Sequence, residues 1–176
     1  MPDNLKKIGQ YAFYNTAISS VNLPDGIETI SSYAFFSSDV SNLVLPETLK
    51  TIGYYAFGGT KVKNVYIPES VTSIGRYAFE GCKSLKKITF TNVVCQMDWC
   101  DLLEEIIYPA DFTDFNRYRG DLIAFKCPNL KKITFPSVEN KHNIKISVED
   151  YDVFDIDDLE NIVSEESKGK LPSYKR

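Results

Sequence analysis

The sequence predicts an α/β-type repeat solenoid that is mostly β-strand, because two phrases recur with a period of 22 residues. The first phrase is "IGQYAF", "ISSYAF", "IGYYAF" and "IGRYAF", at 8–13, 30–35, 52–57 and 74–79. The second phrase is "ISSVNLP", "VSNLVLP" and "VKNVYIP", at 18–24, 40–46 and 62–68. A period in the low twenties is typical of a solenoid, in which each repeat forms one coil and the coils share a core.

The second phrase predicts a short strand, because apolar residues alternate with outward-facing ones over its last positions. The residues expected to point inward are Val21, Leu23, Leu43, Leu45, Val65 and Ile67. A proline follows each of these strands. Proline has no N–H to donate to a neighbouring strand, so it ends the hydrogen-bonded ladder and turns the chain.

The rest of each unit completes the coil. The segments "GIETI", "TLKTI" and "SVTSI" supply two further apolar positions, such as Leu49 and Ile52. In the Gly-Xaa-Tyr-Ala-Phe phrase we expect glycine to turn the chain, alanine to permit close approach of coils, and phenylalanine to fill the centre. Cys82 and Cys127 fall at the repeat position of Thr16, Ser38 and Thr60, which predicts a ladder of small buried side chains.

The regular spacing ends after Phe90. Strand-like segments begin at 18, 40, 62, 85, 103 and 130, so one coil comes early and the next carries an insertion near 116–121. "LLEEIIYPADF" supplies a degenerate strand through Leu103, Ile106 and Tyr108, and "IAF" at 123–125 replaces Tyr-Ala-Phe.

These repeated positions together resemble the BspA-like (treponemal-type) leucine-rich repeat. Three full units match over 18–79, and half-units flank them at 5–13 and 85–90. The resemblance implies a curved, right-handed leucine-rich-repeat solenoid with a parallel sheet on its concave side and little regular helix. Members of the family resemble surface antigens and adhesins, which implies a non-enzymatic module that recognises a protein or a glycan at the cell surface or after secretion.

The predicted organisation is a solenoid over 1–136, regular over 5–90 and divergent with an insertion over 91–136. Residues 137–166 are expected to form a capping strand and a short helix with acidic residues in its first turn, where the helix dipole favours them. Residues 167–176 are expected to be a disordered tail. The chain enters mid-unit at "NLKKIGQYAF", so either it is a piece of a longer solenoid or the edge near Leu5–Ile8 is open to self-association.

Composition excludes several classes of function. With a net charge of −4, 43% hydrophobic and 25% charged residues, nothing favours nucleic acid as a partner, and no apolar run favours membrane insertion. The single histidine, His142, lies in a polar turn-like run without a nucleophile placed beside it. The sequence lacks the closely spaced Cys and His residues of a zinc site, so no metal is expected. It also lacks a glycine-rich phosphate-binding loop, so no cofactor is expected. Four cysteines are too few for a disulfide scaffold, although a Cys95–Cys100 disulfide stays open as an alternative.

The face that the repeat leaves free is the candidate binding site. Strands about 4.8 Å apart would align the outward residues into rows on a rigid surface. The candidate partner-binding residues are Asn22, Asn42, Val44, Asn64, Tyr66, Lys87, Thr89, Glu105 and Lys132. Varied side chains on a fixed frame suit recognition, and the alternative, a merely solvated sheet face, carries equal weight.

A second candidate site is the tripeptide Arg119-Gly120-Asp121, which resembles an integrin-binding motif and lies in the predicted insertion. It would form an adhesion loop if the protein is a surface adhesin. The alternative function is a cytoplasmic scaffold or regulatory interaction protein, favoured because no signal peptide begins at Met1 and no glycosylation sequon is present.

Overall fold

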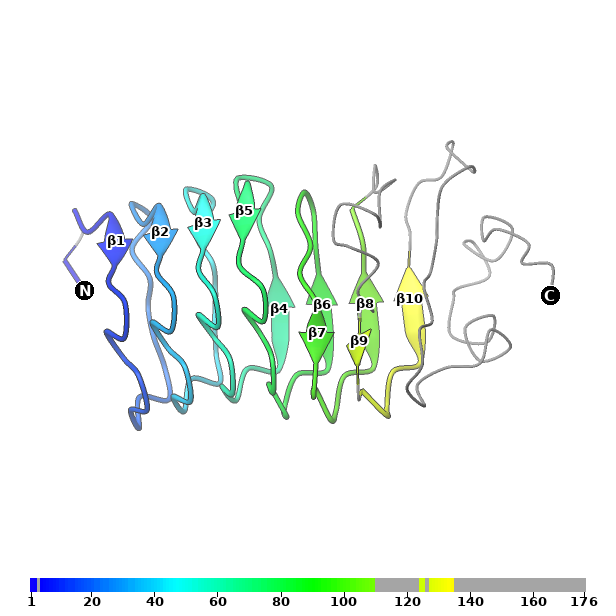
Figure 1. The fold of residues 1–176 in the computed structure, drawn as a ribbon. Helices are drawn as coiled ribbons and strands as arrows, with labels where there is room; N and C mark the ends of the chain where they lie inside the picture. The colour runs from blue at the N-terminus through cyan, green and yellow to red at the C-terminus, as the bar shows by residue number, and fades with distance from the viewer. Residues whose placement is uncertain (3, 110–123, 126, 135–176) are drawn as a thin grey trace, which may run out of the picture.

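The computed structural model describes residues 1–2, 4–109, 124–125 and 127–134. Within these ranges the chain forms a solenoid of stacked coils, with β1 at one end and β10 at the other (Figure 1). The described residues contain strands and turns, and no helix among them is long and apolar enough to cross a membrane. The predicted cap at 137–166, the tail at 167–176, His142 and the Arg119–Asp121 tripeptide lie outside the described residues.

The first parallel sheet comes from the residues just before the Gly-Xaa-Tyr-Ala-Phe phrase. Its strands, in the order β1-β2-β3-β5, are Lys7–Ile8, Thr29–Ile30, Thr51–Ile52 and Ser73–Ile74. Each isoleucine pairs with the isoleucine of the next coil, as in Ile8 with Ile30. The sequence predicted these residues only as apolar positions, so this sheet is an additional finding.

The second parallel sheet comes from the predicted strand phrase. Its strands, in the order β4-β6-β8-β10, are Asn64–Tyr66, Lys87–Thr89, Glu105–Ile107 and Lys132–Thr134. Asn64 pairs with Lys87, Lys87 with Glu105, and Glu105 with Lys132. These steps equal the predicted steps from 62 to 85, 103 and 130, so the predicted strand spacing is confirmed. The insertion expected near 116–121 lies outside the described residues.

The first two coils lack the strands expected at 18–24 and 40–46. Here the structure has only an isolated parallel bridge between Ser20 and Asn42. A strand requires backbone hydrogen bonds to a neighbouring strand, and in the described residues no such bond joins Leu43–Leu45 to the next coil. The predicted inward residues are nevertheless in place, since Leu23, Leu43 and Leu45 are buried.

A third sheet has two strands, β7 (Met97–Asp98) and β9 (Ala124–Phe125). The N–H of Gly81 donates to the carbonyl of Asp98 at 2.8 Å, which aligns Met97 with Phe79 of the preceding coil. Because Met97 pairs with Ala124, it is Ala124 that occupies the register position of that phenylalanine. The prediction that 123–125 replaces Tyr-Ala-Phe is therefore wrong by one residue.

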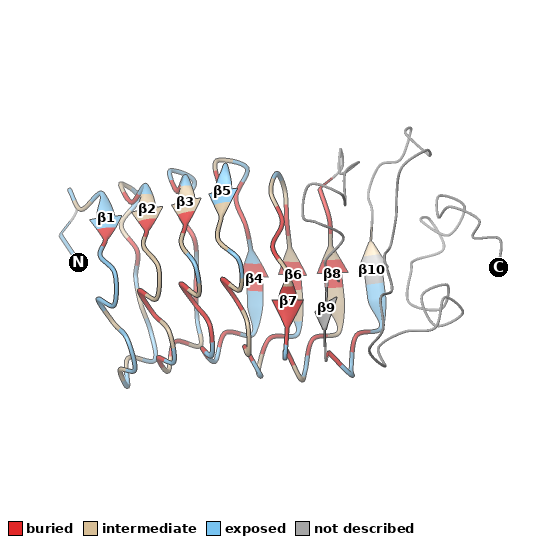
Figure 2. Cartoon of the chain, viewed as in Figure 1, coloured by how far each residue is buried: buried red, intermediate tan, exposed pale blue. Residues whose placement is uncertain are grey.

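The core is a column of side chains that repeats from coil to coil, and Figure 2 shows buried residues recurring at equivalent places. Phe57 stacks between Phe35 and Phe79, with ring centroids 5.2 and 5.3 Å apart. All three rings are fully buried. The backbone reinforces the same column, because the N–H of Phe35 donates to the Ala56 carbonyl and that of Phe57 to the Ala78 carbonyl, both at 2.8 Å.

The turn residue of the phrase is tyrosine, which corrects the role expected for glycine. The φ values of Tyr11, Tyr33, Tyr55 and Tyr77 are 60, 58, 51 and 58°. They lie in the left-handed region, which residues other than glycine rarely adopt. Their rings lie against one another from coil to coil, stacked for Tyr11–Tyr33 and Tyr33–Tyr55 and tilted by 32° for Tyr55–Tyr77. Gly53 is needed instead for close approach, since a Cβ there would meet the backbone of Ser32 in the preceding coil.

The predicted ladder of small residues is confirmed and extended. Thr60 donates its hydroxyl to the Phe57 carbonyl at 2.8 Å, and Cys82 and Cys127 are buried as expected. Cys100 lies in the same ladder rather than in a disulfide with Cys95, because all four cysteines are free thiols. The Cys95 sulfur lies 4.0 Å from the sulfur of Met97, whereas the Cys100 thiol donates to the Phe79 carbonyl at 3.4 Å.

Candidate recognition surface

The outward side chains of β4, β6, β8 and β10 form what we call the strand face, together with the equivalent residues Ser20, Asn22, Asn42 and Val44. Strand register aligns them into two rows. One row contains Asn64, Lys87, Glu105 and Lys132, and the other contains Tyr66, Thr89, Ile107 and Thr134. The residues between the rows, Val65, Ile88 and Ile106, are buried, so the alternation predicted from the sequence is confirmed.

Every candidate residue of the strand face that was predicted from the sequence points outward. Asn22, Asn42, Val44, Asn64, Tyr66 and Lys132 are exposed, and Lys87, Thr89 and Glu105 are half-buried. They do not form one site, however. A charged cluster contains Lys87, Glu105 and Lys132. A pocket is lined by Val44, Asn64, Tyr66, Lys87 and Thr89, so Lys87 belongs to both groups, whereas Asn22 and Asn42 belong to neither.

The charged cluster is centred on Glu105. Its carboxylate lies 2.7 Å from the Lys87 ammonium through Oε2 and 3.1 Å from the Lys132 ammonium through Oε1. These bonds cross three neighbouring strands, because register brings the three residues side by side. The hydrogen bond from Lys87, reinforced by that from Lys132, lowers the pKa of Glu105 against the opposing effect of burial.

This lowered pKa predicts a dependence of stability on acid. Because the folded-state pKa of Glu105 lies below that of the unfolded chain, the carboxylate stabilises the fold at neutral pH. That contribution is fully present above about pH 4.3, the usual value for glutamate, and is lost as pH falls through the lower folded-state pKa. The cluster is partly exposed, so we expect at most about 1 kcal/mol. Carbon-detected NMR titration of the Glu105 carboxyl measures its midpoint, and a midpoint at or above about 4.3 would contradict the prediction.

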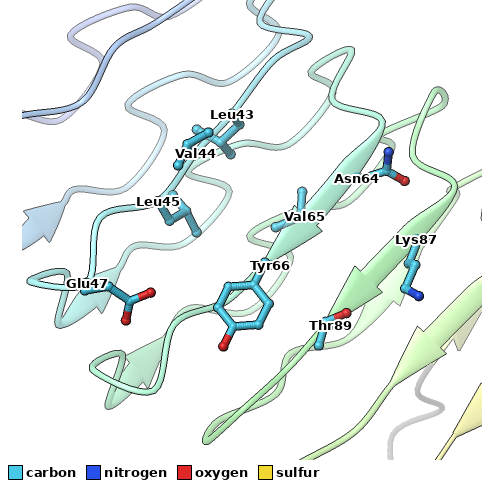
Figure 3. Close-up of a pocket in the computed structure, with 9 residues that line it drawn as sticks. All are labelled: Leu43, Val44, Leu45, Glu47, Asn64, Val65, Tyr66, Lys87 and Thr89. Carbon is cyan, nitrogen blue, oxygen red and sulfur yellow. The ribbon is translucent and has the colours of Figure 1, made fainter.

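The pocket lies on the strand face across the second, third and fourth coils, with a volume of about 390 Å³. Figure 3 shows Tyr66 at its centre, with Glu47 on one side and Thr89 of β6 on the other. The residues lining it are Leu43, Val44, Leu45, Glu47, Asn64, Val65, Tyr66, Lys87 and Thr89. Val44 is 73% exposed and Tyr66 is 54% exposed, whereas Leu43, Leu45 and Val65 are buried beneath them.

The pocket arises from a step in side-chain size and from the gap in strand pairing. Val44 in the second coil stands at the row position that Tyr66 occupies in the third. The short side chain leaves a hollow beside the large ring, and the buried leucines provide an apolar floor. A carboxylate at Glu47 and an ammonium at Lys87 place opposite charges around this floor. The arrangement can bind an apolar group and orient it by polar contacts.

Glu47 is the pocket residue that the sequence did not indicate. It follows Pro46 in the turn after the strand phrase, where Asp25 and Glu69 stand in the neighbouring units. The acidic residue that recurs after this proline is the sequence feature that could have indicated Glu47. Within the described ranges, no group of three or more His, Cys, Asp or Glu side chains could hold a metal ion.

Comparisons with known proteins agree with this architecture. The family model for the BspA type leucine-rich repeat region matches six copies, over residues 1–99 and 59–174. A search of curated proteins finds no match. The crystal structure of a leucine-rich repeat protein from Bacteroides ovatus is similar, with 27% sequence identity and a TM-score of 0.55. The similarity covers 76% of this chain and 38% of that protein, so the chain spans well under half of its length. The repeat phrases, the parallel coils and the family match together show that this chain belongs to the BspA-type leucine-rich repeat family.

Proposed function

We propose that the chain is a non-enzymatic recognition module that binds a protein partner on its strand face, centred on the pocket around Tyr66. The observation that carries the proposal is an exposed aromatic ring beside an exposed valine, above a buried apolar floor and between opposite charges. Proteins of the leucine-rich repeat family and fold typically act in interactions rather than in catalysis, which supports the same function.

The energetics of interfaces explain why Tyr66 should dominate binding. Binding energy concentrates in a few aromatic or arginine residues near the centre of an interface, surrounded by residues that exclude water. Tyr66 has that position, since Asn64, Lys87 and Thr89 flank it on β4 and β6. The frame beneath it is rigid because the paired strands are fixed by the buried column of side chains. Little ordering is then required on binding.

We expect Tyr66→Ala to weaken partner binding by at least about 30-fold, as truncation of a central aromatic residue does. The partner is first captured on immobilised wild-type protein, and its dissociation constant is then measured by calorimetry. Tyr14→Ala is the matched control, because Tyr14 is similarly exposed, at 46%, and does not line the pocket. The control should bind like the wild type.

Two results would overturn the proposal. If a captured partner binds equally well after Tyr66→Ala, Asn64→Ala and Lys87→Ala, the strand face is not its site. If Tyr14→Ala weakens binding as much as Tyr66→Ala, the contact lies elsewhere on the solenoid. Protease treatment of the captured material distinguishes a protein from a glycan, since a glycan ligand would survive it.

A further inference from the structure

Three cysteines form a column inside the solenoid. Cys82, Cys100 and Cys127 lie on three successive coils and are 0, 0 and 1% exposed. They continue the inner ladder that Thr16, Ser38 and Thr60 begin in the earlier coils. None of these thiols has a role in the strand face, because they are enclosed in the core.

Strand register brings Cys100 and Cys127 opposite each other. On one side of the pair, Met97 is aligned with Ala124 and Asp98 with Phe125. On the other side, Glu105 is aligned with Lys132. Each of these steps is 27 residues, which is also the step from Cys100 to Cys127. Neighbouring strands lie about 4.8 Å apart, within the Cα separation of about 4.4–6.8 Å that a disulfide requires.

The two sulfur atoms also interact directly. A hydrogen bond between the thiols raises the pKa of Cys100 and lowers that of Cys127. Cys82 is the competing neighbour of Cys100 in the column, but its sulfur contacts the Phe57 carbonyl at 3.2 Å and the Thr60 hydroxyl at 3.4 Å. The Cys100 thiol likewise donates to the Phe79 carbonyl at 3.4 Å and the Cys127 thiol to the Met97 carbonyl at 3.5 Å, so such carbonyl contacts do not distinguish the candidates. The hydrogen bond between the two thiols is what favours Cys127 over Cys82 as the partner of Cys100.

We propose that Cys100 and Cys127 form a disulfide when the chain folds in the presence of a low-molecular-weight disulfide. One protein thiolate attacks that disulfide, forms a mixed disulfide and releases one small thiol. The second protein thiolate attacks the protein sulfur of the mixed disulfide and releases the other small thiol. The two cysteines lose two protons and two electrons in total, and the small disulfide is reduced to two thiols. Because both sulfur atoms are buried in the folded coil, the exchange takes place before the coils close.

The bond would fasten two coils at the point where the repeat loses its regularity. It spans the step of 27 residues, the longest between neighbouring strands of the second sheet. Closing a loop of this length restricts the unfolded chain, so the oxidised protein should be the more stable form. This proposal is independent of what the strand face binds.

The test is oxidative refolding of the full chain. Reduced, denatured protein is refolded in a mixture of reduced and oxidised glutathione, alkylated and digested, and the linked peptides are identified by mass spectrometry. We expect a linked pair containing Cys100 and Cys127. The oxidised protein should unfold about 5–10 °C higher than protein refolded with dithiothreitol.

Two variants make the result specific. Cys82→Ser/Cys95→Ser keeps only the proposed pair and should retain both the linked peptides and the rise in Tm. Serine is acceptable at position 82 because Ser38 occupies the equivalent position. Cys127→Ser should lose both effects, with circular dichroism confirming its fold under reducing conditions. A Cys82–Cys100 or Cys95–Cys100 pair in the wild type, or four free thiols in a natively folded product, would overturn the proposal. If Cys127→Ser does not fold, the peptide map of the wild type decides alone.

Discussion

Replacing Phe57 with alanine should lower the free energy of unfolding by about 3–5 kcal/mol, the usual cost of truncating a buried phenylalanine. Its ring is fully buried and stacked between Phe35 and Phe79, so truncation removes contacts in both directions along the column. The neighbouring coils cannot collapse into the space, because their backbones are hydrogen-bonded to one another on either side. Urea unfolding followed by circular dichroism measures the change.

Tyr66→Ala is the matched control for this loss. It also removes an aromatic ring, but one that is 54% exposed on the strand face. Surface substitutions of this kind usually change stability by no more than about 0.5 kcal/mol. Equal losses for Phe57→Ala and Tyr66→Ala would contradict the assignment of Phe57 to the core.

Gly53→Ala should lower the free energy of unfolding by about 3 kcal/mol, although it adds a single methyl group. This is the upper end of the usual cost of overpacking, about 1–3 kcal/mol. The new Cβ would meet backbone atoms of Ser31 and Ser32, which belong to the coil beneath. A side chain could rotate away from such a contact, whereas backbone atoms can move only if the two coils separate. The same urea unfolding experiment measures this loss.

Gly9→Ala provides the comparison at the equivalent position of the first coil, where nothing lies within 4 Å of the added Cβ. It should leave stability unchanged or slightly raised, because alanine restricts the unfolded chain more than glycine does. If Gly9→Ala and Gly53→Ala lower the free energy of unfolding by the same amount, close packing between coils does not explain the glycine at position 53.

The sequence predicted the solenoid well because most of its determinants are local and recur. Val65 and Ile67 face inward because alternation in a strand requires it, and Phe57 is buried because a large ring without a polar group at the same position of every unit is best accommodated in the shared core. Even the irregular steps to Lys87, Glu105 and Lys132 followed from apolar spacing. What the sequence could not provide was backbone conformation. Tyrosine is rarely found at positive φ, so its role at Tyr55 is visible only in three dimensions.

The candidate site was predicted as a face, and only part of that face forms a pocket. Outward positions follow from alternation, so Asn64, Tyr66 and Lys87 could be named from the sequence. The hollow could not, because it depends on a difference in size between Val44 and Tyr66 in neighbouring coils and on missing backbone pairing. Glu47 reaches the pocket from a turn, and no periodic pattern indicates which way a turn residue points.

The coil-to-coil hydrogen bonds also bear on how the chain folds. The N–H of Phe13 bonds to Ala34, that of Phe35 to Ala56 and that of Phe57 to Ala78, so every partner is about one coil away. Adding coils lengthens the chain without lengthening these separations, and the relative contact order therefore falls as the solenoid grows. Coils can be added one at a time to a folded neighbour, and the entropy of loop closure for each addition is that of about one coil, whatever the total length.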